Sequence, residues 1–205
     1  MGDRGERDQV ERDHQQTTGG AAVRGESPSI KFANTRYSVR GQLREGIGTP
    51  EELSGWLAAE SLALGLEPGA ASIGEREVAA FLGLRAAVRS VLRTATEGQA
   101  PAPEDIAVLN AAAATVPSWP ELTVSGDTYA VVERTGGGYT DSALAALARD
   151  AIAVLGGSLR PELRACHAPG CTQFFVREHP RQEWCGPACG NRARAARHYR
   201  KQRAV

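Results

Sequence analysis

All four cysteines of this chain lie between residues 166 and 189, in the pattern C-x4-C-x13-C-x3-C. Two closely spaced pairs of thiols separated by a longer segment are typical of a site for one zinc ion. Four thiolate ligands fill the tetrahedral coordination of zinc, so the pattern predicts a structural ion and not a catalytic one. The predicted ligands are Cys166, Cys171, Cys185 and Cys189.

The charge of the chain is unevenly distributed, although the formal net charge over its 205 residues is zero. Residues 160–205 hold ten basic and three acidic side chains, a balance of +7, which leaves −7 on the remainder. An acidic part joined to a basic part suggests two separate tasks. A basic end that also holds a zinc site is typical of a module that meets a polyanion such as DNA.

The sequence divides into three segments. Residues 1–28 are polar and charged, and we expect a disordered tail there. Residues 29–159 carry the apolar periodicity of a folded body, and residues 160–205 form the zinc finger. Hydrophobic residues make up 41% of the chain, which is typical of a globular protein.

The body contains several helix signals. Thr49 followed by Pro50 and two acidic residues predicts an N-cap and the first turn of a helix. Residues 75–96 repeat apolar side chains at helical spacing, and only Arg85 interrupts that face. Further helices are expected from Pro103 onward and over residues 141–156.

Strand signals are fewer. Residues 30–39 alternate in character and predict a strand. Residues 121–124 and 128–132 are rich in β-formers and flank a turn that contains Gly126, which predicts a hairpin. The fold class is therefore α+β, with a mostly helical body that carries a β-hairpin or small sheet.

The finger is expected to be treble-clef-like, with a hairpin and a helix. Residues 173–176 predict a strand, the turn follows at residues 179–181, and Trp184 lies on the predicted return strand. The last helix then carries Cys189 near its N-terminus, where the helix dipole favours a thiolate.

The last helix is rich in arginine and alanine. At about 100° per residue, one face collects Ala188, Ala195, Ala196 and Tyr199, and we expect that face to pack on the hairpin. A basic stripe on the opposite face is the candidate for phosphate contact. For Arg192 and Asn191 we favour a structural role over base reading. Arg192 would stabilise the zinc site, and Asn191 would cap backbone groups at the start of the helix. The candidate nucleic-acid-binding residues are Arg192, Arg194, Arg197, Arg200 and Lys201.

Several short motifs resemble a known family. Phe174-Phe175-Val176, Trp184-Cys185 and Cys189-Gly190-Asn191-Arg192 resemble the CGNR zinc-finger family. Residues 32–35 (FANT) and 53–57 (LSGWL) of the body resemble the ABATE domain that usually accompanies this finger. The resemblance covers residues 30–203. It implies one zinc on the four cysteines, DNA binding by the finger, and a role as a stress-responsive bacterial transcription regulator.

Three functions remain open from the residues. The chain is a DNA-binding regulator, or a protein- or RNA-interaction module with structural zinc, or a small-molecule binding protein. The body would sense an effector or form a homodimer, which would present two fingers to two half-sites. Its candidate pocket residues, otherwise core or turn residues, are Asn34, Thr35, Arg36 and Trp56.

Other classes of protein are not indicated. No free cysteine remains for catalysis, and neither a Gly-x-Ser-x-Gly nor a His-Glu-x-x-His motif occurs, so we expect no enzyme. No apolar stretch approaches the ~18–20 residues of a membrane helix, and the N-terminus lacks a signal-peptide core. A cytoplasmic protein without membrane contact is the expectation.

Overall fold

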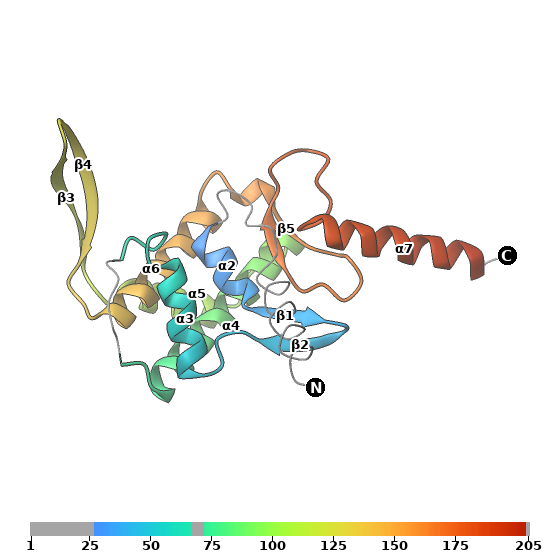
Figure 1. The fold of residues 1–205 in the computed structure, drawn as a ribbon, viewed down its shortest axis with the longest axis horizontal. Helices are drawn as coiled ribbons and strands as arrows, with labels where there is room; N and C mark the ends of the chain where they lie inside the picture. Colours follow the sequence, from blue (N-terminus) through green and yellow to red (C-terminus); the bar gives the residue numbers. More distant parts are fainter. Residues whose placement is uncertain (1–26, 67–71, 204–205) are drawn as a thin grey trace, which may run out of the picture.

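The computed structural model describes residues 27–66 and 72–203. Within these ranges, six α-helices and three two-stranded antiparallel sheets form the predicted α+β fold (Figure 1). The predicted tail, residues 1–28, lies outside the described residues except for its last two. Ser27 is buried and Pro28 begins a helix, so these two residues belong to the folded body.

The first described helix, α2 (Pro28–Asn34), occupies a segment that the sequence predicts as a strand, so that prediction is wrong. Pro28 presets the helical backbone in the first turn. Ile30 and Phe32 are fully buried, and this packing among helices overrides the alternating sequence pattern. Strand structure begins only with β1 (Arg36–Val39), which pairs with β2 (Gln42–Glu45).

The other predicted helices of the body are present. They are α3 (Pro50–Glu60), α4 (Glu75–Glu97), α5 (Pro103–Ala113) and α6 (Tyr139–Gly156). Thr49 caps α3 as predicted, because its hydroxyl accepts from the Glu52 amide at 3.2 Å while the Glu52 carboxylate accepts from the Thr49 amide at 3.1 Å. Helices α2, α4, α5 and α6 enclose the main core.

The charged residue that interrupts the apolar face of α4 is buried and paired. Arg85 is 4% exposed, and its guanidinium donates to both carboxylate oxygens of Glu45 and, at 2.7 Å, to the Thr35 hydroxyl. Burial opposes ionisation of Glu45. The hydrogen bond from Arg85 and those from the amides of Ile47 and Gly46 outweigh it, so the pKa of Glu45 lies below its usual value. The pair therefore ties β2 to α4.

The predicted hairpin of the body is longer than expected and stands away from the helices. Strands β3 (Ser118–Ser125) and β4 (Thr128–Thr135) pair along their whole length, with Leu122 opposite Val131. The hairpin projects from one end of the molecule in Figure 1, and helix α7 (Pro187–Arg203) projects from the other. We refer to residues 118–135 as the arm.

A short helical turn, η1 (Arg160–Glu162), leads from the body into the finger, which starts with a hairpin of β5 (Leu163–Ala165) and β6 (Phe174–Val176). The predicted partner of β6 is therefore wrong, because β6 pairs with β5 and Trp184 lies in a bend. The other edge of β6 is already occupied. The Asn34 side chain donates to the Phe174 carbonyl at 2.8 Å and accepts from the Phe174 amide at 2.9 Å.

The finger and the body share one hydrophobic core. Leu163 and Phe174 are 3% and 5% exposed, and both belong to the cluster formed by the body helices. Arg89 of α4 donates to the carbonyls of Ala33, at 2.5 Å, and Thr172, at 2.9 Å, and its guanidinium lies 5.2 Å from the centre of the Phe174 ring. Burial, followed by the neighbouring arginines, lowers the pKa of Arg89 to about 10. The finger is thus anchored to the body by packing and by buried polar contacts.

Candidate metal centre and nucleic-acid interface

The four predicted zinc ligands converge on one point. Their sulfur atoms all lie within 4.8 Å of one another. The Sγ–Sγ distance is 3.8 Å for Cys171 and Cys185, and 3.4 Å for Cys185 and Cys189. Tetrahedral zinc with Zn–S bonds of about 2.3 Å requires sulfurs about 3.8 Å apart. The spacing therefore matches a zinc site with four cysteine ligands.

Two local structures place the ligands. Cys166 and Cys171 flank a tight turn between β5 and β6, in which Gly170 has φ of +71° and the Cys171 amide donates to the Ala168 carbonyl at 2.9 Å. Cys189 lies in the first turn of α7, which begins at Pro187. A zinc-binding turn facing a helix N-terminus is the treble-clef-like layout that the sequence predicts.

The electrostatics of the cluster favour a cation. Hydrogen bonds from Cys171 and Cys185 hold the pKa of Cys166 well below its usual range. In the same cluster, hydrogen bonding with Cys166 and Cys171 raises the pKa of Cys185. Four sulfurs at these distances cannot all ionise without a compensating charge, and a divalent metal supplies it. The donor set and its spacing thus fit zinc.

Arg192 lies against the metal centre. Its guanidinium donates to the Cys189 sulfur at 3.0 Å. Four thiolates around Zn²⁺ carry a net charge of about −2, and a guanidinium bonded to one sulfur offsets part of it. This contact matches the favoured interpretation of Arg192 as a brace. Asn191 accepts a hydrogen bond from Arg194 at 2.5 Å at the start of the helix.

The packed face of α7 differs from the predicted one. Cys189, Gly190 and Ala193 are buried, whereas Ala188, Ala195 and Tyr199 are exposed, Tyr199 by 66%. Cys189 must turn toward the other three sulfurs, and this requirement sets the rotation of the helix. The sequence-based prediction instead placed the packed face at the alanines and Tyr199.

Gly190 shows how closely the packed face approaches Trp184. A Cβ atom at position 190 would lie 3.2 Å from Cδ1 of Trp184. The missing side chain therefore lets the indole approach the helix beside the zinc site. Trp184 also packs on the small cluster that includes Phe175.

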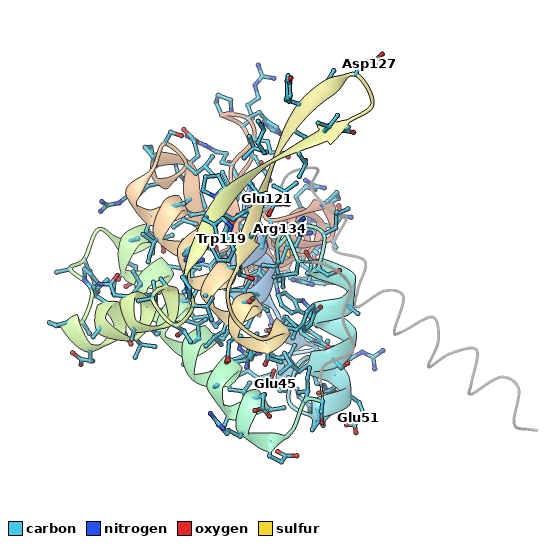
Figure 2. The ribbon with its side chains drawn as sticks, turned by 90° about the vertical axis from the view of Figure 1, so that its left-hand side faces the viewer. Glu45, Glu51, Trp119, Glu121, Asp127 and Arg134 are labelled. Atoms are coloured by element: carbon cyan, nitrogen blue, oxygen red, sulfur yellow. The ribbon has the colours of Figure 1, made fainter. Side chains whose placement is uncertain are left out.

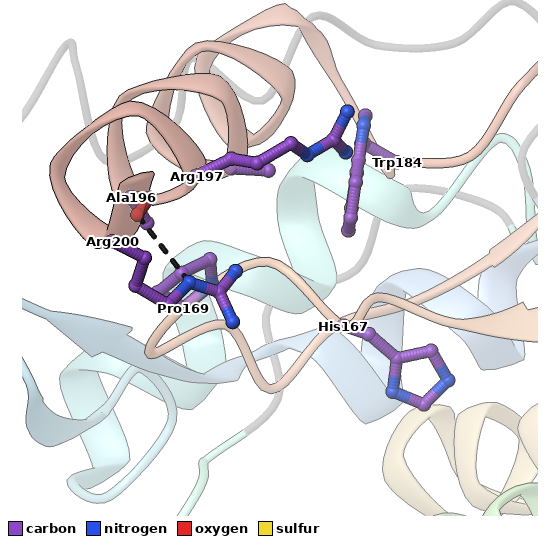
Figure 3. A pocket seen from close by; sticks show the side chains of 7 residues that line it. His167, Pro169, Trp184, Ala196, Arg197 and Arg200 are labelled. Carbon is purple, nitrogen blue, oxygen red and sulfur yellow. Dashed lines mark hydrogen bonds between the residues drawn. The ribbon is translucent and has the colours of Figure 1, made fainter. Parts of the chain in front are cut away.

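The observed rotation of α7 places two arginines beside a groove that the sequence did not predict. A cavity of about 360 Å³ lies between the zinc-binding turn and α7 (Figure 3). In Figure 3 the Arg197 side chain extends toward Trp184, and Arg200 lies over Pro169. The cavity is lined by His167, Pro169, Trp184, Ala193, Ala196, Arg197 and Arg200. Two arginines and an indole in one groove suit an anion attached to a planar ring.

All five predicted nucleic-acid-binding residues lie on the exposed surface of α7. The helix contains six arginines and lysines and no acidic residue. Arg197 and Arg200 flank the groove, and Arg194 and Lys201 continue the same side of the helix at about 100° per residue. The basic stripe thus adjoins the packed face, whereas the sequence predicted it opposite that face.

The predicted pocket residues of the body serve other contacts. The Asn34 amide bonds the backbone of Phe174, and the Thr35 hydroxyl donates to the Phe32 carbonyl and accepts from Arg85. The ring of Trp56 lies 5.5 Å from that of Phe32. The carbonyl of Arg36 accepts from Arg89 at 3.3 Å. These four residues therefore line neither the groove nor the second cavity described next.

A second cavity, of about 320 Å³, lies among α4, α5 and α6. Its wall is mostly apolar and includes Val91, Ile106, Leu109 and Ile152, with Arg160 at one side. Sequence reasoning missed this site, because its apolar residues have ordinary helical spacing and carry no separate signal. Arg160 begins the turn that leads into the finger.

Taken together, these features define a class of protein, a helical body that shares its core with a treble-clef-like zinc finger of four cysteine ligands. Two family models match the chain. The first, ABATE, described as "Putative stress-induced transcription regulator", covers residues 26–158, and the second, the CGNR zinc finger, covers residues 162–202. The chain belongs to the ABATE family, and its residues 162–202 form a CGNR zinc finger that holds one structural zinc ion. No curated protein matches it.

The family matches confirm the resemblance noted from the sequence. They also support a role in regulating transcription, in the words that describe the ABATE model. In the part of the chain that the structure describes, no helix is both long and apolar enough to cross a membrane.

Proposed function

We propose that this chain is a transcription regulator that binds DNA phosphates through α7 and the groove beside its zinc site. The observation that carries the proposal is the composition of α7. This helix contains six basic residues and no acidic residue, and it projects from the body (Figure 1). A helix of this charge attracts the phosphate backbone.

The attachment of α7 supports this role. The first turns of the helix are fixed by zinc, by Arg192 on the Cys189 sulfur, and by the packing of Gly190 against Trp184. The later residues from Arg197 onward are exposed. A fixed first turn followed by an exposed basic segment lets several guanidinium groups reach consecutive phosphates, and the internal hydrogen bonds of Arg194 and Arg200 stay within α7 itself.

The groove adds a second type of contact. Arg197 extends toward Trp184, and Arg200 lines the same groove beside Pro169, so a phosphate at Arg197 would lie near the indole. Aromatic side chains beside cations are typical of nucleic-acid interfaces, where bases or sugars pack on the ring. We therefore assign phosphate contact to Arg194, Arg197, Arg200 and Lys201, and a bracing role to Arg192.

The body is proposed to carry the sensing function. The cavity among α4, α5 and α6 is apolar, and Arg160 at its side suits a small amphipathic anion. The same residue starts η1, which precedes the finger directly, so an effector held there would contact the connection between the two parts. The proposed role involves no catalytic step. Cys166, Cys171, Cys185 and Cys189 form no disulfide, which suits a reducing cytoplasm.

The test is a salt titration of binding. Zinc-loaded full-length protein is titrated into labelled genomic duplex fragments at several salt concentrations, beside the variant Arg197→Ala/Arg200→Ala/Lys201→Ala. Three lost phosphate contacts should reduce the slope of log K against log salt by about 2.7 and weaken binding to every fragment. The arginine that bonds a ligand sulfur is Arg192, which this variant retains, so the metal site should remain intact.

A matched control removes three exposed arginines from the body, in the variant Arg44→Ala/Arg76→Ala/Arg93→Ala. This control has the same net charge as the α7 variant but should keep the slope of the parent chain. Failure of the parent chain to bind duplex at low salt would refute the DNA proposal. Tighter binding to single-stranded RNA, or salt-independent capture of a protein, would assign the finger to the alternative classes.

A further inference from the structure

The arm exposes an unusual amount of apolar surface on one face. Directly opposite residues of an antiparallel ladder point to the same side, so the pairs Leu122–Val131 and Val124–Tyr129 share one face. These four side chains are 67–78% exposed. We refer to them as the arm face. Neither strand of the arm makes extensive contact with another element among the described residues.

The opposite face of the arm differs. Thr123 and Ala130 are half-buried, and Glu121 and Arg134 form an ion pair of 3.1 Å. Figure 2 shows Asp127 at the tip and Trp119, Glu121 and Arg134 nearer the base. The ion pair thus lies on the side of Trp119 and Val132, whereas the four residues of the arm face lie on the other side, with Glu133 nearer the base.

A hairpin of this kind is not expected to stand alone in water. Two-stranded sheets are marginally stable unless a face is covered. Contiguous exposed apolar patches on monomers seldom exceed about 300–600 Å² and commonly mark an interaction site. The arm face concentrates three aliphatic side chains and one tyrosine, with no charged residue between Leu122 and Tyr129 on that side.

We propose that the arm face packs against the arm face of a second copy of this chain. An uncharged aliphatic surface is complementary to itself, and two hairpins of equal length can pack face to face as in a β-sandwich. Pairing along the β3 edge is disfavoured, because Pro120 lies in that strand and donates no hydrogen bond.

The size of the patch fits such a contact. Two arm faces would bury on the order of 1,000 Å² in total, near the lower end of the range for specific interfaces. The dimer should therefore be weak and dependent on concentration. The arm and α7 project from opposite ends of the molecule, so a dimer formed through the arms leaves both basic helices uncovered (Figure 1). The contact does not depend on DNA binding.

Sedimentation equilibrium of zinc-loaded full-length protein without DNA, over a wide range of concentration, tests the proposal. The expected result is a shift from 21.7 kDa toward twice that mass as concentration rises. Val131→Lys places a charge on the arm face and should reduce association at least tenfold. Ala130→Lys, on the opposite face of the same strand, should leave association within about twofold of the parent chain.

A second measurement needs no variant. Hydrogen exchange of the backbone amides in β3 and β4 should slow as protein concentration rises, while exchange in α4 should stay constant. A parent chain that remains monomeric at every concentration would overturn the proposal. So would a dimer that Val131→Lys leaves intact, since the arm face would then have another occupant or none.

Discussion

Two antiparallel hairpins of this protein differ in almost every respect. The arm has eight residues in each strand, stands away from the helices, and exposes the large side chains of one face. The hairpin of β5 and β6 has three residues in each strand, yet Leu163, Phe174 and Phe175 are nearly fully buried. The short hairpin is held by a zinc site on one side and the core of the body on the other.

The comparison shows that strand length does not measure how firmly a hairpin is fixed. A ladder of backbone hydrogen bonds contributes little net free energy when the unfolded strands can bond to water instead. Burial of Phe174 and coordination of zinc contribute far more. Four predictions test this difference.

Removing zinc should have the largest effect. A structural zinc ion contributes about 10–16 kcal/mol of binding free energy in zinc-finger peptides, so a chelator should unfold residues 163–203. Because Leu163 and Phe174 lie in the shared core, the body should also lose thermal stability, while the arm should be unaffected. Circular dichroism and hydrogen exchange measure the two responses. Recovery on adding zinc back is the control, and an unchanged melting temperature of the body would contradict the shared core.

Phe174→Ala should have the second largest effect on stability. Deleting a buried phenylalanine costs about 3–5 kcal/mol, from lost burial and the cavity that remains. The matched substitution in the arm, Tyr129→Ala, removes a ring that is 78% exposed and should change the unfolding free energy of dilute protein by about 0.5 kcal/mol or less. Urea unfolding at fixed zinc concentration compares the two. Equal losses would mean that the arm is as firmly packed as the finger.

Asn34→Ala should have a moderate effect. The substitution leaves the amide and carbonyl of Phe174 without their partner, at a cost of about 2 kcal/mol. Exchange of the Phe174 amide should become faster in the folded protein. Asn110→Ala, at an exposed position of α5, is the control and should leave both quantities nearly unchanged. A loss of unfolding free energy as small as that of the control would show that the Asn34 carboxamide does not stabilise the finger.

Leu122→Ser should have the smallest effect on the dilute protein. The side chain is 67% exposed, so its replacement should alter the unfolding free energy by about 0.5 kcal/mol or less. The measurement is urea unfolding at a concentration where the chain is monomeric. A loss above about 1.5 kcal/mol would show that the arm face already packs within a single copy.

The metal site was readable from the sequence because its chemistry is local. Four cysteines in two short-spaced pairs permit few other arrangements, and the capping residues around Thr49 act within one turn. The long helices were predicted for a similar reason, since apolar spacing over residues 75–96 leaves little ambiguity.

The predictions from the sequence were wrong where contacts between residues far apart in the chain determine the structure. The segment from Ile30 reads as a strand but folds as α2, because its packing partners lie far along the chain. Three-residue strands such as β5 are too short to show alternation, so the partner of β6 was misplaced. The rotation of α7 follows from the position of Cys189 relative to three other sulfurs, which no helical wheel contains. The groove lined by Arg197 and Trp184 was missed with it.

The contact between Asn34 and Phe174 also protects the finger from self-association. A strand edge with free backbone groups is a template for strands of other chains, and β6 would present such an edge beside β5. One carboxamide matches the donor and the acceptor of Phe174, and Gln173 adds a bond to the Asn34 carbonyl at 3.2 Å. A single side chain at the end of α2 thus closes the sheet and discourages aggregation through this edge.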